Sequence, residues 1–316
     1  MIPGQNLSKT IIIPAKNEED FISKVLTTLP NFVDRIVVVD DGSSDMTAQI
    51  VNKHSTELKN LELIQLQGNG VGSAIDAGHQ AMLKSLSEPF VSVVMAGDGQ
   101  MDPDDLELLI EPVTKNQADY VKGNRFLHQD GLGNMPLVRK IASMVLGFFT
   151  TLAAGRHVTD PQCGYTATSS LILNHWNWSK SWKGYGYPNY WLIELSRRSM
   201  RVAEVPVKSI YGKEKSGIIM AKFFLSVGLM MLIMHHKRCF SMLFSKSVAP
   251  HTILSFIAYT LGWITIIPGV STDLESELTA GFASKLILLV FCWVCAHILD
   301  RLAVESRTEL RVNAQT

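Results

Sequence analysis

The 316-residue sequence lacks a charge imbalance and has few cysteines. Lysine plus arginine and aspartate plus glutamate both number 29, so there is no electrostatic case for a nucleic-acid partner. Four cysteines do not suggest a disulfide framework. Cys292 and Cys295 form a CxxC without a second pair inside an apolar run, which favours packing over zinc or redox chemistry. No N-terminal signal peptide is evident, because residues 1–9 are short and polar.

Long apolar runs are present, and they lie near the C-terminus. Residues 248–270 carry no charged side chain and are numerous enough to cross a bilayer. Residues 280–298 form a second such run, with Lys285 near enough to its start to snorkel. A buried helix of a soluble protein is the alternative, and two consecutive runs weaken it. We therefore expect a transmembrane hairpin.

Charge around the hairpin predicts its orientation. The loop at residues 271–278 is acidic, whereas basic residues lie outside the pair of runs: Lys237, Arg238 and Lys246 before it, and Arg301, Arg307 and Arg311 after it. Because cytoplasmic flanks are rich in lysine and arginine, both ends of the hairpin and everything before it are expected in the cytoplasm. The expected location is the inner or plasma membrane.

A shorter apolar segment, residues 223–234, precedes the basic sequence His235, His236, Lys237, Arg238. It is too short to span a bilayer, and we interpret it as an interfacial helix, with a core helix of the soluble part as the alternative. The predicted organisation is a cytoplasmic domain at 1–220, an interfacial amphipathic helix at 221–246, a two-helix transmembrane hairpin at 247–300 and a cytoplasmic tail at 301–316.

The first 122 residues alternate between short apolar runs and segments of helical period. The runs occur at 10–13, 35–39, 61–66, 90–95 and 118–121, and the helical segments between them at 18–29, 44–54, 73–86 and 103–116. This alternation is typical of an α/β fold with a mainly parallel sheet and helices on both faces. Ligands in such sheets bind beyond the carboxyl ends of the strands.

Each expected strand ends in a polar or glycine-rich segment, at 14–18, 40–43, 68–72, 96–100 and 122–125. A dinucleotide-binding Rossmann fold is excluded, because its glycines belong in the first turn with an acid following them. Here the acids Asp40 and Asp41 follow the second strand. Glycines 68, 70 and 72 follow the third, with the wrong spacing.

The remaining chemistry is that of a nucleotide diphosphate. Asp40 and Asp41 can accept hydrogen bonds from base or ribose donors, and Gly97 lets the backbone come close to a ligand. Asp98 and Gln100 offer hard oxygen ligands suited to Mg²⁺ or Mn²⁺. A helix N-cap at residues 40–43 is the simpler alternative, but it leaves two adjacent acids unexplained.

The motifs "IIIPAKNEE", "VVVDDGSSDMT", "MAGDGQMDPDDL", "GNRF", "TDPQCGY" and "EVPV" occur in one order. In that order and spacing they resemble the family 2 glycosyltransferases of the GT-A nucleotide-sugar-binding fold, over about residues 8–217. With two C-terminal spans and an interfacial helix, the chain is similar to the polyprenyl-phosphate glycosyltransferases within that family.

The resemblance implies roles for the strand-end residues. Pro14, Ala15 and Glu18 match the first nucleotide-contacting loop, and Asp41 matches the base-contacting acid. Asp98 and Gln100 match the last two ligands of a D-x-D-x-Q metal motif whose first ligand is replaced by Ala96. The loop that often carries a basic residue has none here, so backbone N–H groups such as that of Gly70 are expected to contact the nucleotide instead.

The resemblance also implies the reaction. Asp98, Arg125 and Asp160 are the expected catalytic residues, and inversion at the anomeric carbon is the expected outcome. A phosphate acceptor is already an anion and needs no strong base. A sugar hydroxyl would need one, and Asp160 would be the first candidate.

A basic rim beside an apolar helix favours a lipid-phosphate acceptor. The expected acceptor-binding residues are Arg125, Arg139, Ser143, Lys213 and Lys215, although a solvated loop explains either lysine alone equally well. The leading hypothesis is transfer from a nucleotide sugar to a polyprenyl phosphate of the undecaprenyl type. The alternatives are transfer to a hydroxyl of a lipid-linked glycan and an inactive membrane scaffold. A homo-oligomer is expected by analogy only.

Overall fold

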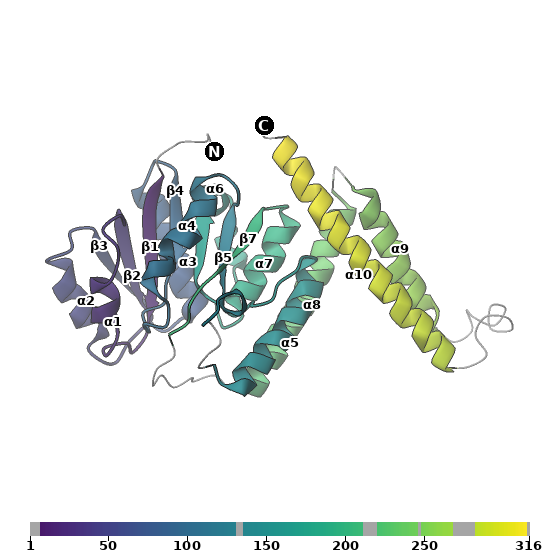
Figure 1. Cartoon of the computed structure of the whole chain (residues 1–316), viewed down its shortest axis with the longest axis horizontal. Helices are drawn as coiled ribbons and strands as arrows, with labels where there is room; N and C mark the ends of the chain where they lie inside the picture. Colours follow the sequence, from purple (N-terminus) through teal and green to yellow (C-terminus); the bar gives the residue numbers. More distant parts are fainter. Residues whose placement is uncertain (1–6, 131–134, 211–219, 246–247, 268–281, 315–316) are drawn as a thin grey trace. The chain divides into compact units, whose positions relative to one another are not determined.

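The computed structural model describes residues 7–130, 135–210, 220–245, 248–267 and 282–314 (Figure 1). Seven strands in these residues form one sheet in the order β3-β2-β1-β4-β6-β5-β7. β6 is antiparallel to both of its neighbours, and the other pairs are parallel. The strands are β1 Ser8–Ala15, β2 Arg35–Asp40, β3 Leu61–Gln65, β4 Phe90–Val94, β5 Tyr120–Asn124, β6 Thr166–Ser169 and β7 Val202–Pro206.

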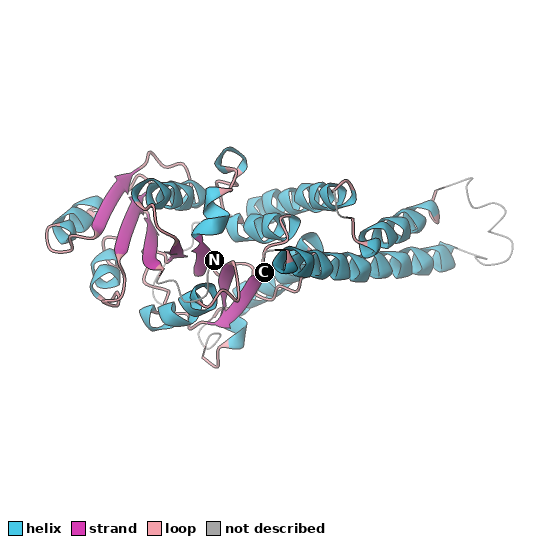
Figure 2. Cartoon of the chain, turned by 90° about the horizontal axis from the view of Figure 1, so that it is seen from above, coloured by secondary structure: helices cyan, strands magenta, loops and turns pink. Residues whose placement is uncertain are grey.

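Helices alternate with strands as predicted through α4, and the longest helices, α5, α8 and α10, come later in the chain. They are α1 Ile22–Thr27, α2 Thr47–Ser55, α3 Val71–Ser85, α4 Leu106–Thr114, α5 Leu137–Ala154, α6 Ser170–Asn174, α7 Tyr187–Arg197, α8 Met220–Leu243, α9 Pro250–Ile264 and α10 Phe282–Asn313. The mainly parallel α/β architecture is therefore as the sequence predicts, with helices on both sides of the strands (Figure 2).

Alternate residues of β1 show how the two faces of the sheet are filled. Ile11 and Ile13 belong to one buried cluster with side chains of α1 and α4. Ile12 points to the opposite face, as the two-residue period of a strand requires. There it packs against Gly78 of α3. The contact is so close that a Cβ added at Gly78 would stand only 2.4 Å from Ile12 Cγ2. Gly78 thus permits close packing of α3 on the sheet, which in turn fixes where α3 begins at the strand ends.

The chain divides into two compact units, which are considered separately. The first contains the sheet and comprises Met1–Phe149, Val158–Trp191 and Met200–Met230. The second comprises Thr150–His157, Leu192–Ser199 and Met231–Thr316. Because these units interleave along the sequence, they do not test the predicted domain boundaries at 220, 246 and 300, which stay predictions.

Two described helices, α5 (Leu137–Ala154) and α10 (within it, Ala283–Asn313), are long and apolar enough to cross a membrane, by length and composition alone. The second predicted span, 280–298, falls largely in α10. For the first, 248–270, the described helix is α9, of 15 residues, and residues 268–270 lie outside the described part. The sequence predicts no membrane span at α5, whose first turns carry the predicted acceptor-binding residues Arg139 and Ser143.

The predicted interfacial helix corresponds to α8. Its buried residues recur every three or four positions from Phe223 through Val227 and Met234 to Met242, which is the spacing of one helix face. Apolar residues also face away from the protein, including Leu225 and Leu229. Lys237 is also exposed on this helix. An interfacial helix turns its apolar side to lipid, so the exposed leucines are consistent with the prediction, which stays a prediction.

Candidate functional site

A cavity of about 610 Å³ lies in the first unit and brings together residues from distant parts of the sequence. Five predicted site residues line it: Asp98, Gln100, Arg125, Arg139 and Ser143. They come from the end of β4, the end of β5 and the first turns of α5. Its volume lies within the usual range for small-molecule sites. The cavity therefore unites the predicted metal-binding and acceptor-binding residues.

Asp160 holds Arg125 in place at this cavity. The Arg125 side chain donates from Nε to Oδ2 at 2.7 Å and from Nη2 to Oδ1 at 2.8 Å, and its backbone N–H donates to Oδ2 at 3.0 Å. The Ser143 hydroxyl adds a bond to Oδ1 at 3.2 Å. Asp160 itself is fully buried. A bidentate pair of this kind fixes the plane of the guanidinium, so Arg125 presents a defined face to the cavity.

The electrostatics keep Asp160 ionised. Burial acts to raise its pKa, but the hydrogen bonds from Arg125 and the charges of Lys122 and Arg125 outweigh it and lower the pKa to about 2. Lys122, also fully buried, donates to the backbone carbonyl groups of Asp160 and Cys163. Lys122 begins the polar strand end at 122–125, but the sequence predicts no role for it, because its partners lie 38 and 41 residues away. Its hydrogen bonds to these two carbonyl groups stabilise the turn at residues 160–163.

Asp98 and Gln100 stand at the cavity with a geometry suited to a hard cation. The Asp98 carboxylate accepts from the Gln100 backbone N–H at 3.0 Å, which ties the two residues into one turn. Gly99 between them has a φ of +70°, a conformation that favours glycine. Ala96 supplies no ligand atom, and its N–H approaches Met101 Sδ at 3.2 Å. One carboxylate and one amide oxygen fit Mg²⁺ or Mn²⁺ that completes its coordination with diphosphate and water.

The two acids after β2 are buried and already hydrogen-bonded. Asp40 accepts from the backbone N–H of Ser43 at 3.0 Å and from its hydroxyl. This turn is not the helix N-cap considered as the simpler alternative, because α2 begins at Thr47 with Met46 at its N-cap position. Asp41 accepts from the N–H groups of Asn69 and Gly70 at 2.8 and 2.9 Å. The Gly70 N–H is thus bonded to Asp41, and its predicted contact with the nucleotide stays a prediction.

A basic residue does reach this loop, although from another strand. Lys16 follows β1, and its Nζ lies 3.4 Å from the Cβ position of Gly68. Lys16 is exposed, so it can supply the positive charge that the 67–72 loop lacks in its own sequence. Lys16 stands in the "IIIPAKNEE" motif beside Pro14, Ala15 and Glu18, so the motif itself contains this basic residue.

The remaining predicted nucleotide-binding residues lie at neighbouring strand ends. The Gly97 N–H donates to the Pro14 carbonyl at 3.0 Å, and a Cβ on Gly97 would meet the Cβ of Ala15 at 3.1 Å. The Glu18 N–H donates to Thr47 Oγ1 at 2.8 Å. The structure thus places the first loop beside the metal-motif segment, as parallel strands require, although these residues do not line the 610 Å³ cavity.

A second buried carboxylate, Asp76, anchors one wall of the cavity. It accepts from Ser181 Oγ at 3.1 Å, Lys183 Nζ at 2.5 Å and Tyr187 Oη at 2.9 Å. The Gly72 N–H donates to the Lys183 carbonyl at 2.9 Å. These contacts clamp residues 181–187 onto the start of α3. Sequence reasoning missed this clamp, because Asp76 sits within an ordinary helical pattern.

The aromatic segment at residues 174–191 mostly packs inside the fold. Trp176 and Trp191 are buried and stack with ring centroids 3.8 Å apart. Tyr185 differs, because it is more than half exposed and lines the cavity. Tyr187 lines the cavity as well. Lys213 and Lys215 lie outside the described residues.

Comparison with known proteins decides the family. The model of glycosyl transferase family 2 matches residues 10–175. The chain belongs to this family. The match covers β1 through α6, and it thereby includes Asp98, Arg125 and Asp160. The chain is therefore a glycosyltransferase, which leaves its donor and acceptor as the open questions.

Two curated relatives carry names that state an acceptor. A UDP-N-acetylglucosamine–dolichyl-phosphate N-acetylglucosaminyltransferase of Methanococcus voltae is 32% identical over 215 residues, covering 64% of this chain and 85% of the relative. A dolichyl-phosphate beta-glucosyltransferase of Trichomonas vaginalis is 28% identical over 213 residues, covering 66% of this chain and 62% of the relative.

Solved structures show the same fold at low identity. Glucosyl-3-phosphoglycerate synthase of Mycobacterium tuberculosis in complex with uridine diphosphate aligns with a TM-score of 0.55 and 18% identity over 73% of this chain and 81% of that one. Its complex with Mn²⁺, uridine diphosphate and phosphoglyceric acid gives 0.54 and 19%, over 73% and 79%. At this identity the likeness establishes the GT-A fold and nothing finer.

Proposed function

We propose that this glycosyltransferase moves a sugar from a nucleotide diphosphate sugar to a polyprenyl phosphate at the cytoplasmic face of a membrane. The observation that carries the proposal is the 610 Å³ cavity, in which Asp98 and Gln100 share one space with Arg125 and Arg139. A site that must hold two phosphorylated substrates needs cationic groups for both. The acceptor end of this cavity is formed by α5, whose outer residues are apolar.

The state of Asp160 favours a phosphate acceptor over a hydroxyl. With a pKa near 2 and both oxygens bound to Arg125, Asp160 is a weak proton acceptor. A sugar hydroxyl would need a stronger base in the same place. A phosphate monoester is already ionised at neutral pH, so its oxygen can attack without losing a proton.

The proposed reaction is a displacement at the anomeric carbon. A phosphate oxygen of the acceptor forms a bond to that carbon while the bond to the donor diphosphate breaks, and the electron pair leaves on the nucleoside diphosphate. Arg125, oriented by Asp160, binds phosphate oxygens at the centre of the cavity, and Arg139 binds those of the acceptor. A divalent cation held by Asp98 and Gln100 would neutralise charge on the leaving diphosphate.

Membrane attachment is proposed from the apolar helices. The exposed face of α5 includes Leu137, Val138, Ile141, Met144 and Phe148, each more than half exposed. A water-facing helix would rarely show so continuous an apolar surface. Lipid contact along α5 would bring a polyprenyl chain to the cavity, which the first turns of α5 line. The polyprenyl names of the two relatives support this acceptor class, and the undecaprenyl type is the form to test first.

The test uses membranes that contain the full chain, undecaprenyl phosphate, radiolabelled UDP- and GDP-sugars and Mg²⁺ or Mn²⁺. Label should enter the organic phase as a product labile to mild acid, and Asp98→Ala should abolish it. Asp104→Ala is the matched control, because Asp104 is an exposed acid in the same segment and should leave the rate unchanged. If nucleotide is released only when a glycan acceptor is added, the lipid-phosphate proposal is wrong.

A further inference from the structure

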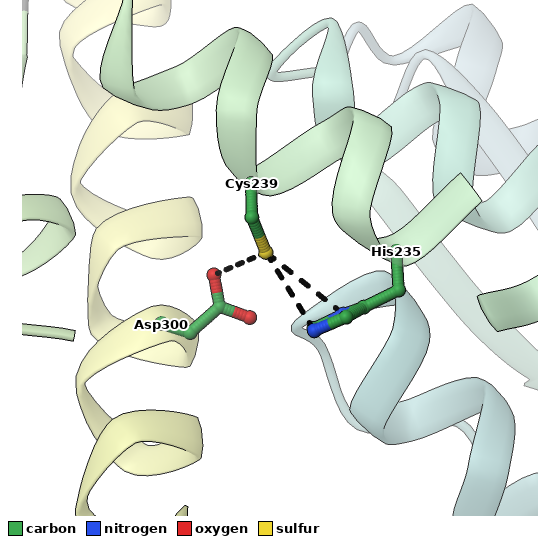
Figure 3. Close-up of side chains that lie close together, drawn as sticks. All are labelled: His235, Cys239 and Asp300. Carbon is green, nitrogen blue, oxygen red and sulfur yellow. Dashed lines mark hydrogen bonds between the residues drawn. The ribbon is translucent and has the colours of Figure 1, made fainter. Parts of the chain in front are cut away.

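A group of metal-ligating side chains lies in the second unit, and the proposed reaction does not use it. His235 and Cys239 are four residues apart on α8, so they share a helix face. His297 and Asp300 are three residues apart on α10 and likewise share a face. The ligand atoms of His235, Cys239 and Asp300 lie within 4.8 Å of one another (Figure 3). We propose that these four residues bind a zinc ion.

The distances support a tetrahedral site. Cys239 Sγ lies 3.8 Å from His235 Nε2 and 4.0 Å from Asp300 Oδ1. Ligand atoms at about 2.0–2.3 Å from a tetrahedral zinc ion stand about 3.3–3.8 Å apart, so small side-chain movements suffice. The His297 ring centroid is 5.7 Å from that of His235, and both rings line one small cavity of about 60 Å³ with Cys239 and Asp300. His297 is placed to complete the set.

The chemistry of the ligand set selects the metal. Imidazole and thiolate are ligands that zinc prefers, whereas Mg²⁺ and Mn²⁺ prefer oxygen. A Cys239 thiolate and the Asp300 carboxylate would together balance the charge of Zn²⁺. Ligands presented from facing helices, two from each, are a known way to build metal sites in helical proteins. This site would therefore be distinct from the proposed cation site at Asp98.

Arg238 is the competing cation and defines the alternative. It is fully buried and donates to Asp300 Oδ1 at 2.9 Å and Oδ2 at 2.6 Å. This ion pair explains Asp300 and Arg238 without any metal. It does not explain why two histidines and a cysteine converge on the same carboxylate and its cavity. In the proposed site Arg238, whose Nη2 also lies 3.5 Å from His235 Nδ1, hydrogen-bonds the carboxylate ligand and orients it, as such partners do.

The experiment titrates Co²⁺, a spectroscopic substitute for zinc, into the chelator-treated full chain in detergent. We expect one equivalent to produce thiolate-to-cobalt charge-transfer absorption, which Zn²⁺ displaces. His297→Ala should weaken binding by more than about tenfold, and Cys239→Ser should abolish the absorption. Cys295→Ser is the matched control on α10 and should retain it, as should Asp98→Ala, which separates this site from the catalytic cation. Absence of the absorption in the wild-type chain, or its survival in Cys239→Ser, would overturn the proposal and leave the Arg238–Asp300 ion pair as the sole role of the cluster.

Discussion

Arg125 at the end of β5 and Asp160, 35 positions further along the chain, form a bidentate ion pair whose carboxylate is completely buried. The pair joins the "GNRF" and "TDPQCGY" motifs into one structural unit. We therefore expect a substitution of either Arg125 or Asp160 to change the reaction, because each would alter the orientation of the Arg125 guanidinium.

Arg125→Lys tests that orientation. Lysine keeps the charge but cannot make the forked contact with Asp160, so the ammonium group would no longer be fixed in the cavity. We expect kcat to fall about 10²-fold, the loss typical when a positioned charge-stabilising group is removed, with little change in donor KM. The measurement is the initial rate of labelled-lipid formation. A kcat within a factor of two or three of wild type would show that the fork has no catalytic role.

The pH dependence of stability follows from Asp160. Its folded-state pKa, about 2, is below the ordinary value, so ionisation stabilises the folded protein at every pH above that ordinary value. This contribution, about 2 kcal/mol, is lost as pH falls from about 4 toward 2. Denaturant unfolding of wild type and Asp160→Asn should therefore differ at pH 6 and converge at low pH. If the free energy of unfolding changed with pH equally in the two proteins, Asp160 would not contribute to the pH dependence of stability.

The same pKa predicts the shape of the activity profile. Because Asp160 stays ionised throughout the range in which the protein is folded, kcat/KM should show no acidic limb from this residue between pH 5 and pH 8. An inflection in that interval that disappears in Asp160→Asn would show that Asp160 exchanges a proton during turnover, as the hydroxyl-acceptor reaction requires.

Ala96→Asp tests the reduced metal motif. The substitution adds a carboxylate two residues before Asp98, where the family motif has its first ligand. Ala96 is only partly buried, so the longer side chain has room. We expect the Mn²⁺ concentration for half-maximal activity to fall severalfold, because each added carboxylate strengthens binding of a hard cation. An unchanged metal dependence would mean that residue 96 does not face the ion.

Much of the first half of the fold follows from the sequence, because strand and helix periods there are strong. All five predicted strands occur, each within a few residues of its observed ends. β6 and β7 were not predicted. β6, with the sequence Thr-Ala-Thr-Ser, is short and polar, and it is buried only because β4 and β5 flank it. No local pattern reveals a strand whose burial comes from neighbours distant in sequence.

The residues of the candidate site likewise fall into those that the sequence predicts and those that it does not. Asp98, Gln100, Arg125 and Asp160 were found because they stand in motifs at strand ends, where a parallel sheet gathers them. Lys122 and Asp76 were missed because their importance comes from contacts 38 to 111 residues away. The His235–Cys239–Asp300 group was likewise hidden, since its halves lie on α8 and α10, with α9 between them in the sequence.

The clamp at Asp76 gives the last prediction. Asp76→Ala would remove the shared acceptor of Ser181, Lys183 and Tyr187. Ser181 and Tyr187 are buried, and each buried donor left unpaired costs about 1–3 kcal/mol. Since residues 181–187 carry Tyr185 and Tyr187 into the cavity, we expect both a lower free energy of unfolding and a donor KM raised about tenfold.

Glu62→Gln is the matched control for this prediction. It removes one partner of the half-exposed Arg35–Glu62 pair, whose loss should cost no more than about 1 kcal/mol and leave KM unchanged. Denaturant unfolding and donor titration of both variants separate the two effects. If Asp76→Ala lowers stability but leaves donor KM at the wild-type value, the clamp supports the fold alone. The 181–187 segment then takes no part in binding the sugar.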